Sequence, residues 1–143
     1  MKIPQISIFV SNRPGRLHAV CQSLADADIN LLSLTLADNG EFGLIRIIVS
    51  HPEKAVEILS KAGIVATVTE VLACEVSALK GGLAKLLNTP AGTLQIDYMY
   101  AYPTCNDKDI AVMILRFREP DEAIMLLQKA GVKILGRKDL LEE

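Results

Sequence analysis

The residues of this sequence with the clearest capacity for chemistry lie in one segment, 11–17, where an alternating apolar run gives way to a helical pattern. Pro14 suits the first turn of a helix, where its missing N–H costs nothing, and Gly15 lets the backbone approach another group closely. Free N–H groups and the helix dipole at such a junction favour a carboxylate or a phosphate. An ordinary strand-to-helix turn is the alternative. The candidate binding residues are Asn12, Arg13, Pro14, Gly15, Arg16 and Leu17.

The same junction recurs 66 positions later, where its serine, glycine and leucine reappear as Ser77, Gly81 and Leu83. Asn12 is matched by Ala78, so the second copy keeps a backbone able to receive an anion but loses a polar side chain. We therefore expect two unequal binding sites. The candidate residues of the second are Leu79, Lys80, Gly81, Gly82 and Leu83.

The remaining reactive side chains form no catalytic or metal-binding pattern. The three cysteines are widely spaced and lack a CxxC motif, which argues against a zinc site and a disulfide framework. Neither His18 nor His51 is judged to lie beside a candidate cysteine or serine nucleophile. We expect no catalytic residue, no metal and no cofactor.

Hydrophobic periodicity places the first junction in a unit of six elements. Strands are expected at 3–10, 29–37, 44–50 and 64–71, with helices at 14–27 and from Pro52 to a glycine cap at Gly63. The Asn39-Gly40 pair favours a tight hairpin between the second and third strands. The resulting order, strand–helix–strand–strand–helix–strand, is the ferredoxin-like βαββαβ arrangement.

The second half of the chain repeats this order. Residues 52–64 recur as 120–132, with proline, alanine, leucine, lysine and glycine in register. Strands are expected at 72–78, 94–102, 109–117 and 132–135. We predict an α+β protein of two tandem ferredoxin-like modules, 1–71 and 72–143, each an antiparallel sheet with helices packed on one face. Without a flexible linker at the join, the modules should pack directly on each other.

Composition narrows the function classes. The chain has 143 residues, half of them hydrophobic, and a formal net charge of −2. No basic run could neutralise several phosphates, so nucleic acid is not expected as a partner. No apolar run is long enough to span a bilayer, so a cytoplasmic protein without a membrane partner is expected. A small chain has little interior for so many apolar side chains, which favours burial of some of them between subunits. We therefore expect a homo-oligomer, most simply a homodimer.

Segment 12–17 leads into a helix, segment 27–31 enters a strand, and segments 81–85 and 94–102 are related to them. On these segments the chain resembles the ACT domain family over nearly its whole length. The resemblance implies a stand-alone tandem ACT-domain protein that binds a free amino acid at an interface between modules. It also implies that Asn30 and Gln95, which enter the second strands, reach a neighbouring module's ligand; Asn30 could equally be a simple turn residue. Asp97 and Met99 could approach the first module's ligand.

The favoured function is therefore an amino-acid sensor that transmits binding as a change in module or subunit orientation. A regulatory subunit that docks on an amino-acid biosynthetic enzyme is a compatible alternative. An acylphosphatase-like enzyme shares the fold, but the phosphate-binding motif of that family is absent. An RNA-recognition domain shares the strand order but needs exposed aromatic residues, and segment 44–49 has none.

Overall fold

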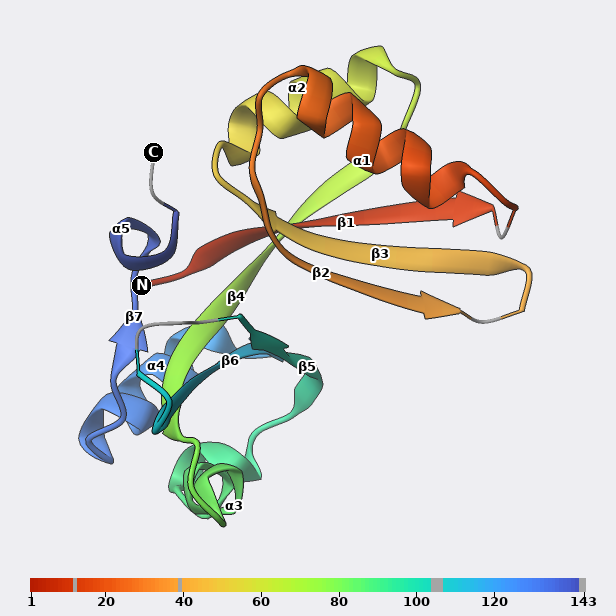
Figure 1. The fold of residues 1–143 in the computed structure, drawn as a ribbon. Coiled ribbons are helices and arrows are strands. Elements are labelled where there is room, and N and C mark those ends of the chain that lie inside the picture. The colour runs from red at the N-terminus through yellow and green to blue at the C-terminus, as the bar shows by residue number, and fades with distance from the viewer. Residues whose placement is uncertain (12, 39, 104–106, 142–143) are drawn as a thin grey trace. The chain divides into compact units, whose positions relative to one another are not determined.

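The computed structural model of the protein describes residues 1–11, 13–38, 40–103 and 107–141. The elements along the chain (Figure 1) are β1 (Ile3–Ser11), α1 (Arg16–Asp26), β2 (Leu31–Asp38), β3 (Phe42–Val49), α2 (Pro52–Lys61), β4 (Ala66–Ser77), α3 (Gly82–Leu87), the 3₁₀ helix η1 (Pro90–Thr93), β5 (Ile96–Tyr102), β6 (Ile110–Phe117), α4 (Pro120–Lys129), β7 (Ile134–Leu135) and α5 (Arg137–Leu140). Within the described residues, no helix is long and apolar enough to cross a membrane.

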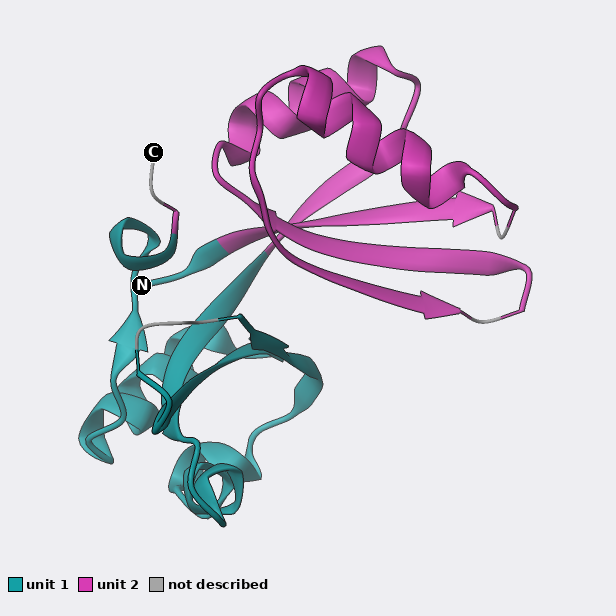
Figure 2. Ribbon diagram, in the orientation of Figure 1, with its two compact units in different colours: residues 1–3, 70–140 teal, residues 4–69, 141–143 magenta. Residues whose placement is uncertain are grey.

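The chain forms two compact units (Figure 2), one of residues 4–69 and 141–143 and the other of residues 1–3 and 70–140. We call them the first and the second module. The predicted boundary after Val71 falls within β4, a strand whose residues are divided between the two units. The division into 1–71 and 72–143 stays a prediction.

The first module has an antiparallel sheet in the order β2-β3-β1, with Ile6 paired to Ile47. Alternate residues of these strands face the helices, which is the period-two pattern seen in the sequence. They form a fully buried core with Leu24 of α1 and Leu59 of α2. The core is aliphatic and lies between the sheet and its two helices.

The second module pairs β4 with β6 on one side and β7 on the other, and β5 extends the sheet beyond β6. Its core includes Leu72, Cys74 and Phe117 of the strands, which pack with Leu86 of α3 and Leu127 of α4. Both modules are ferredoxin-like antiparallel sheets with helices on one face, so the predicted fold class is confirmed.

The internal repeat is visible in the second helix of each module. α2 and α4 both have ten residues and begin with proline. Gly63 and Gly131 follow them with left-handed φ values of 75° and 78°. The next residue then closes the helix end in both modules, with its N–H bonded to a leucine carbonyl at 2.9 Å in the first and 3.0 Å in the second.

Three element predictions need correction. The strands expected at 64–71 and 72–78 are one strand, β4, because no turn residue separates them. The last strand, expected at 132–135, is only β7, since Val132 and Lys133 lie outside the strand, in the segment that joins the turn after α4 to β7. The first helix begins at Arg16 and not at Pro14. The C-terminal helix α5 was not predicted.

Candidate functional site

The first strand-to-helix junction joins β1 to α1 by a tight turn. The Arg13 N–H donates to the Ser11 carbonyl at 2.8 Å, and Gly15 has a left-handed φ of 88° at the helix N-cap. The Ala19 N–H donates to the Gly15 carbonyl at 2.9 Å and starts the helical hydrogen bonds. Glycine is favoured here because L side chains rarely adopt this φ. Asn12, a predicted ligand residue, lies outside the described residues.

The first turn of α1 leaves backbone donors free. Within the described part of the chain, the N–H groups of Leu17 and His18 have no acceptor. The exposed side chains of Arg13 and Arg16 add positive charge beside the turn, and neither forms an ion pair with a described residue. Pro14 is exposed in the turn. With the positive end of the helix dipole, this arrangement can receive a carboxylate or a phosphate.

The second junction repeats the backbone of the first. The Arg16 N–H donates to the Arg13 carbonyl at 3.4 Å, and at the equivalent positions the Gly82 N–H donates to the Leu79 carbonyl at 3.1 Å. Gly81, at the N-cap of α3, has a left-handed φ of 82°. The structure therefore contains the same turn once in each module, as the spacing of the two copies in the sequence predicts.

The side chains and the helix of the second junction differ from the first. Leu79 and Leu83 are exposed, Leu79 to 64%, so two apolar side chains lie beside this turn together with the exposed Lys80. The helix α3 has only six residues, against eleven in α1. The first junction is consequently the stronger candidate for an anion site.

Asn30 does not lie at the first junction of its own module. It follows α1, whose eleven residues extend for about 16 Å away from Arg16. There it lines a hollow of about 510 Å³, which we call the first-module hollow. The other lining residues are Ala25, Asp28, Ile29, Ser50 and His51.

The first-module hollow contains a pair of residues that the sequence analysis passed over. Ser50 Oγ accepts the Asn30 N–H at 2.9 Å and lies 2.9 Å from His51 Nδ1. His51 thus lies beside a serine, which the adjacency of positions 50 and 51 in the sequence could have shown, whereas the prediction concerned a candidate nucleophile. Ser50 is only 4% exposed, so its hydroxyl links two segments and is shielded from a substrate.

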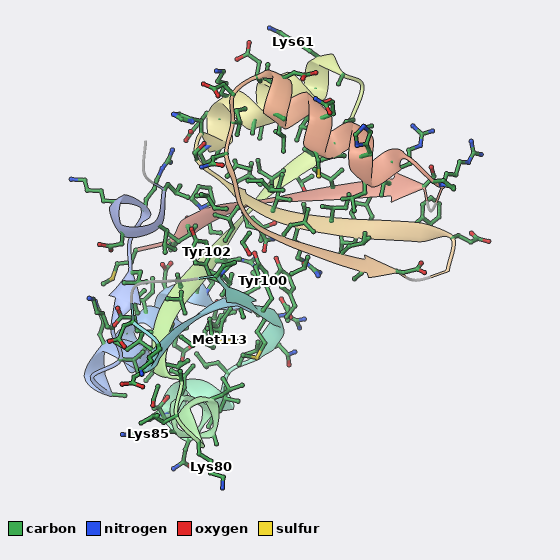
Figure 3. The ribbon with its side chains drawn as sticks, viewed as in Figure 1. Lys61, Lys80, Lys85, Tyr100, Tyr102 and Met113 are labelled. Carbon is green, nitrogen blue, oxygen red and sulfur yellow. The ribbon has the colours of Figure 1, made fainter. Side chains whose placement is uncertain are left out.

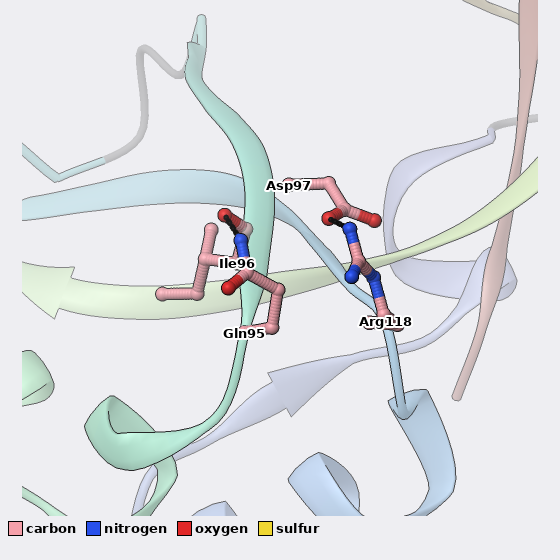
Figure 4. A network of polar contacts seen from close by, with 4 residues as sticks. All are labelled: Gln95, Ile96, Asp97 and Arg118. Carbon is pink, nitrogen blue, oxygen red and sulfur yellow. Dashed lines mark hydrogen bonds and ion pairs between the residues drawn. The ribbon is translucent and has the colours of Figure 1, made fainter.

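The predicted residues on β5, and Gln95 just before it, have separate environments. Asp97 accepts a hydrogen bond at 2.8 Å from the guanidinium of Arg118, to which it is ion-paired (Figure 4). The Gln95 amide donates to the Ile96 carbonyl at 3.2 Å, and Met99 packs against the core of the second module. Their roles in ligand binding stay predictions.

The buried thiol of the second module is unsuited to catalysis. Cys74 is fully buried on β4, and burial raises its pKa to about 12. It is therefore a neutral thiol at physiological pH, and the thiolate is the nucleophilic form. Among the residues that the structure describes, no group of three or more His, Cys, Asp or Glu side chains is placed to hold a metal ion.

The fold and the repeated glycine junction define a class of protein built from two tandem βαββαβ modules. A family model described as an ACT domain pair matches residues 1–142. The chain belongs to this family, and the resemblance inferred from the sequence is confirmed.

Solved structures agree with this assignment. A crystal structure of a protein from Bacteroides thetaiotaomicron has a TM-score of 0.91 and 34% identity, covering 100% of this chain and 98% of that one. The ligand-free regulatory subunit of aspartate kinase from Thermus thermophilus has a TM-score of 0.61 at 17% identity, covering 89% of this chain and 91% of that one. The second likeness concerns the fold alone. No match was found among curated proteins.

Proposed function

We propose that this protein is a non-catalytic regulatory protein that binds a free amino acid at the junction between β1 and α1. The observation that carries the proposal is the geometry of this junction. Gly15 lies in the turn with a left-handed φ, and the N–H groups of Leu17 and His18 have no acceptor among the described residues. A carboxylate is the group that such donors suit. Membership of the ACT domain pair family supports the same conclusion.

In this proposal the ligand is shared between modules. The first junction holds the carboxylate, and the exposed amide of Asn30 from a neighbouring module contacts the ammonium group. Because one ligand then touches two modules, its binding favours one relative orientation over others. Couplings of this kind are typically about 1–3 kcal/mol. We infer a cytoplasmic homodimer as the working form.

The test is a thermal-shift screen of the purified protein against the twenty amino acids, followed by calorimetry on any ligand found. A ligand that binds only the folded protein must raise the melting temperature. Gly15→Val should abolish that rise. Gly63→Val is the matched control, since Gly63 has a similar left-handed φ of 75° and equally open surroundings but lies after α2. Absence of a shift with every amino acid at millimolar concentration would contradict the proposal.

Docking on a metabolic enzyme is a second candidate function, and the exposed aromatic residues of the first module favour it. Phe9 is 65% exposed and Phe42 is 50% exposed, on adjacent strands where Phe42 pairs with Ser11. This register puts both rings on one face of the sheet. Light scattering of the Phe9→Ser variant separates the two uses of this face. A monomer would indicate that the face mediates self-association. An unchanged dimer would leave the face available to an enzyme.

A further inference from the structure

A hollow of about 520 Å³ lies in the second module and is lined by α3, the segment that follows α4 and the end of β4. We call it the second-module hollow. Its volume is within the range of about 300–1,000 Å³ that is usual for small-molecule sites. Of the predicted binding residues it includes only Gly82. Its polar lining comprises Glu75, Ser77, Lys85, Thr89, Asp109 and Lys133.

The hollow exists because α3 is short. Thr89 Oγ1 donates to the Leu86 carbonyl at 2.8 Å, and Pro90 then begins η1. η1 packs against α4, whereas in the first module the long helix α1 packs against α2. The space beside the end of α4 is therefore left open in the second module.

The hollow also contains a free edge of β4. The Glu75 N–H donates to the Lys133 carbonyl at 3.0 Å, on the side of β7, and the Ala78 N–H donates to the Asp109 carbonyl at 2.8 Å, on the side of β6. Because backbone donors alternate between the two sides of an antiparallel strand, the Ser77 N–H points to the side of β7. Within the described residues it has no acceptor there.

The charges of the hollow are balanced but only partly paired. Lys133 Nζ lies 3.4 Å from Glu75 Oε1 and forms an ion pair with it. The side chains of Lys85 and Asp109 form neither an ion pair nor a hydrogen bond with any described residue. One free ammonium and one free carboxylate therefore line the same space, next to apolar side chains such as Leu86.

We propose that the second-module hollow binds a small zwitterion of the α-amino-acid class within a single module. The Ser77 N–H and the Lys85 ammonium hold its carboxylate, Asp109 holds its ammonium group, and the apolar wall contacts its side chain. The proposal rests on the proposed function for its class of ligand. It differs from the proposed function in the position of the binding site, since this site needs neither the first junction nor a neighbouring module.

The test is a titration of the full ¹⁵N-labelled chain, followed by amide NMR, with each of the twenty amino acids in turn at millimolar concentration. We expect shifts at Ser77, Lys85 and Asp109. Lys85→Ala should weaken this binding about tenfold, because a hydrogen bond to a charged group is lost. Lys61→Ala is the matched control and should bind as the wild type does, since Lys61 lies in the last turn of α2 in the first module (Figure 3) and does not line the hollow.

The outcomes separate this proposal from the proposed function. Shifts confined to residues 13–18 would overturn the second-module hollow as a site and leave the first junction in place. Shifts confined to the hollow would support it and count against the first junction. No shift with any amino acid would overturn both. Equal affinity of Lys85→Ala and the wild type would overturn the assignment of the hollow, and the dispersion of the spectra shows that each variant is folded.

Discussion

A Cβ atom added to Gly82 would lie 1.8 Å from the carbonyl oxygen of Ser77. The start of α3 therefore rests directly on the end of β4, and no side chain fits between them. The equivalent position in the first module is Arg16, which has a full side chain. The two junctions share their hydrogen bonds but differ in how closely the helix approaches the strand.

Gly82→Ala should destabilise the second module, because the backbone of Ser77 must move to accept the new methyl group. We expect a loss of about 1–3 kcal/mol in the free energy of unfolding, the usual cost of overpacking. Arg16→Ala is the matched control and should change stability by less than about 0.5 kcal/mol. Urea unfolding measures both, and equal midpoints for the two variants would refute the contact.

Gly15→Ala should cost about 1–2 kcal/mol in the absence of any ligand, because its φ of 88° is unfavourable for an L side chain. The loss is conformational, since beyond its two chain neighbours no atom of the residues that the structure describes lies within 4 Å of the added Cβ. Gly15→Asn should lose less, as asparagine tolerates the left-handed region better. Guanidinium unfolding of the three proteins checks the order, and an alanine variant as stable as the wild type would contradict it.

The sequence predicted the elements whose determinants are local. α2 and α4 were predicted because proline, an apolar stripe and a terminal glycine all lie within thirteen residues. The continuity of β4 was missed, since nothing in the period-two pattern distinguishes one long strand from two short ones without a turn between them.

The candidate sites show the same division. Gly15 and Gly81 were found from the sequence because a turn is a local structure. The second-module hollow was not, because its lining combines Lys85 with Asp109 and Lys133, which are far apart in the chain. Only the pairing of β4 with β6 and β7 brings them to one place, and no pattern within a single segment records that.

Ser50→Ala should destabilise the first module by about 0.5–1.5 kcal/mol, because the Asn30 N–H loses its acceptor at 2.9 Å in a partly buried hydrogen bond. Ser60→Ala is the matched control. Ser60 is exposed on α2, where alanine is the better helix former, so stability should hold or rise slightly. Thermal unfolding of the two variants decides the point, and equal melting temperatures would show that the Ser50 hydroxyl contributes nothing.

The buried thiol of Cys74 should make the protein less stable in alkali. Its pKa is raised from 9.0 to about 12 by burial, so the unfolded chain loses the thiol proton first as the pH rises. The stabilisation is complete below pH 9 and is lost progressively toward pH 12. Between pH 8 and pH 10 the free energy of unfolding of the wild type should fall by about 1.4 kcal/mol more than that of Cys74→Ala. Urea unfolding across this range measures the difference, and parallel pH dependence in the two proteins would show that the thiol ionises as readily in the folded state.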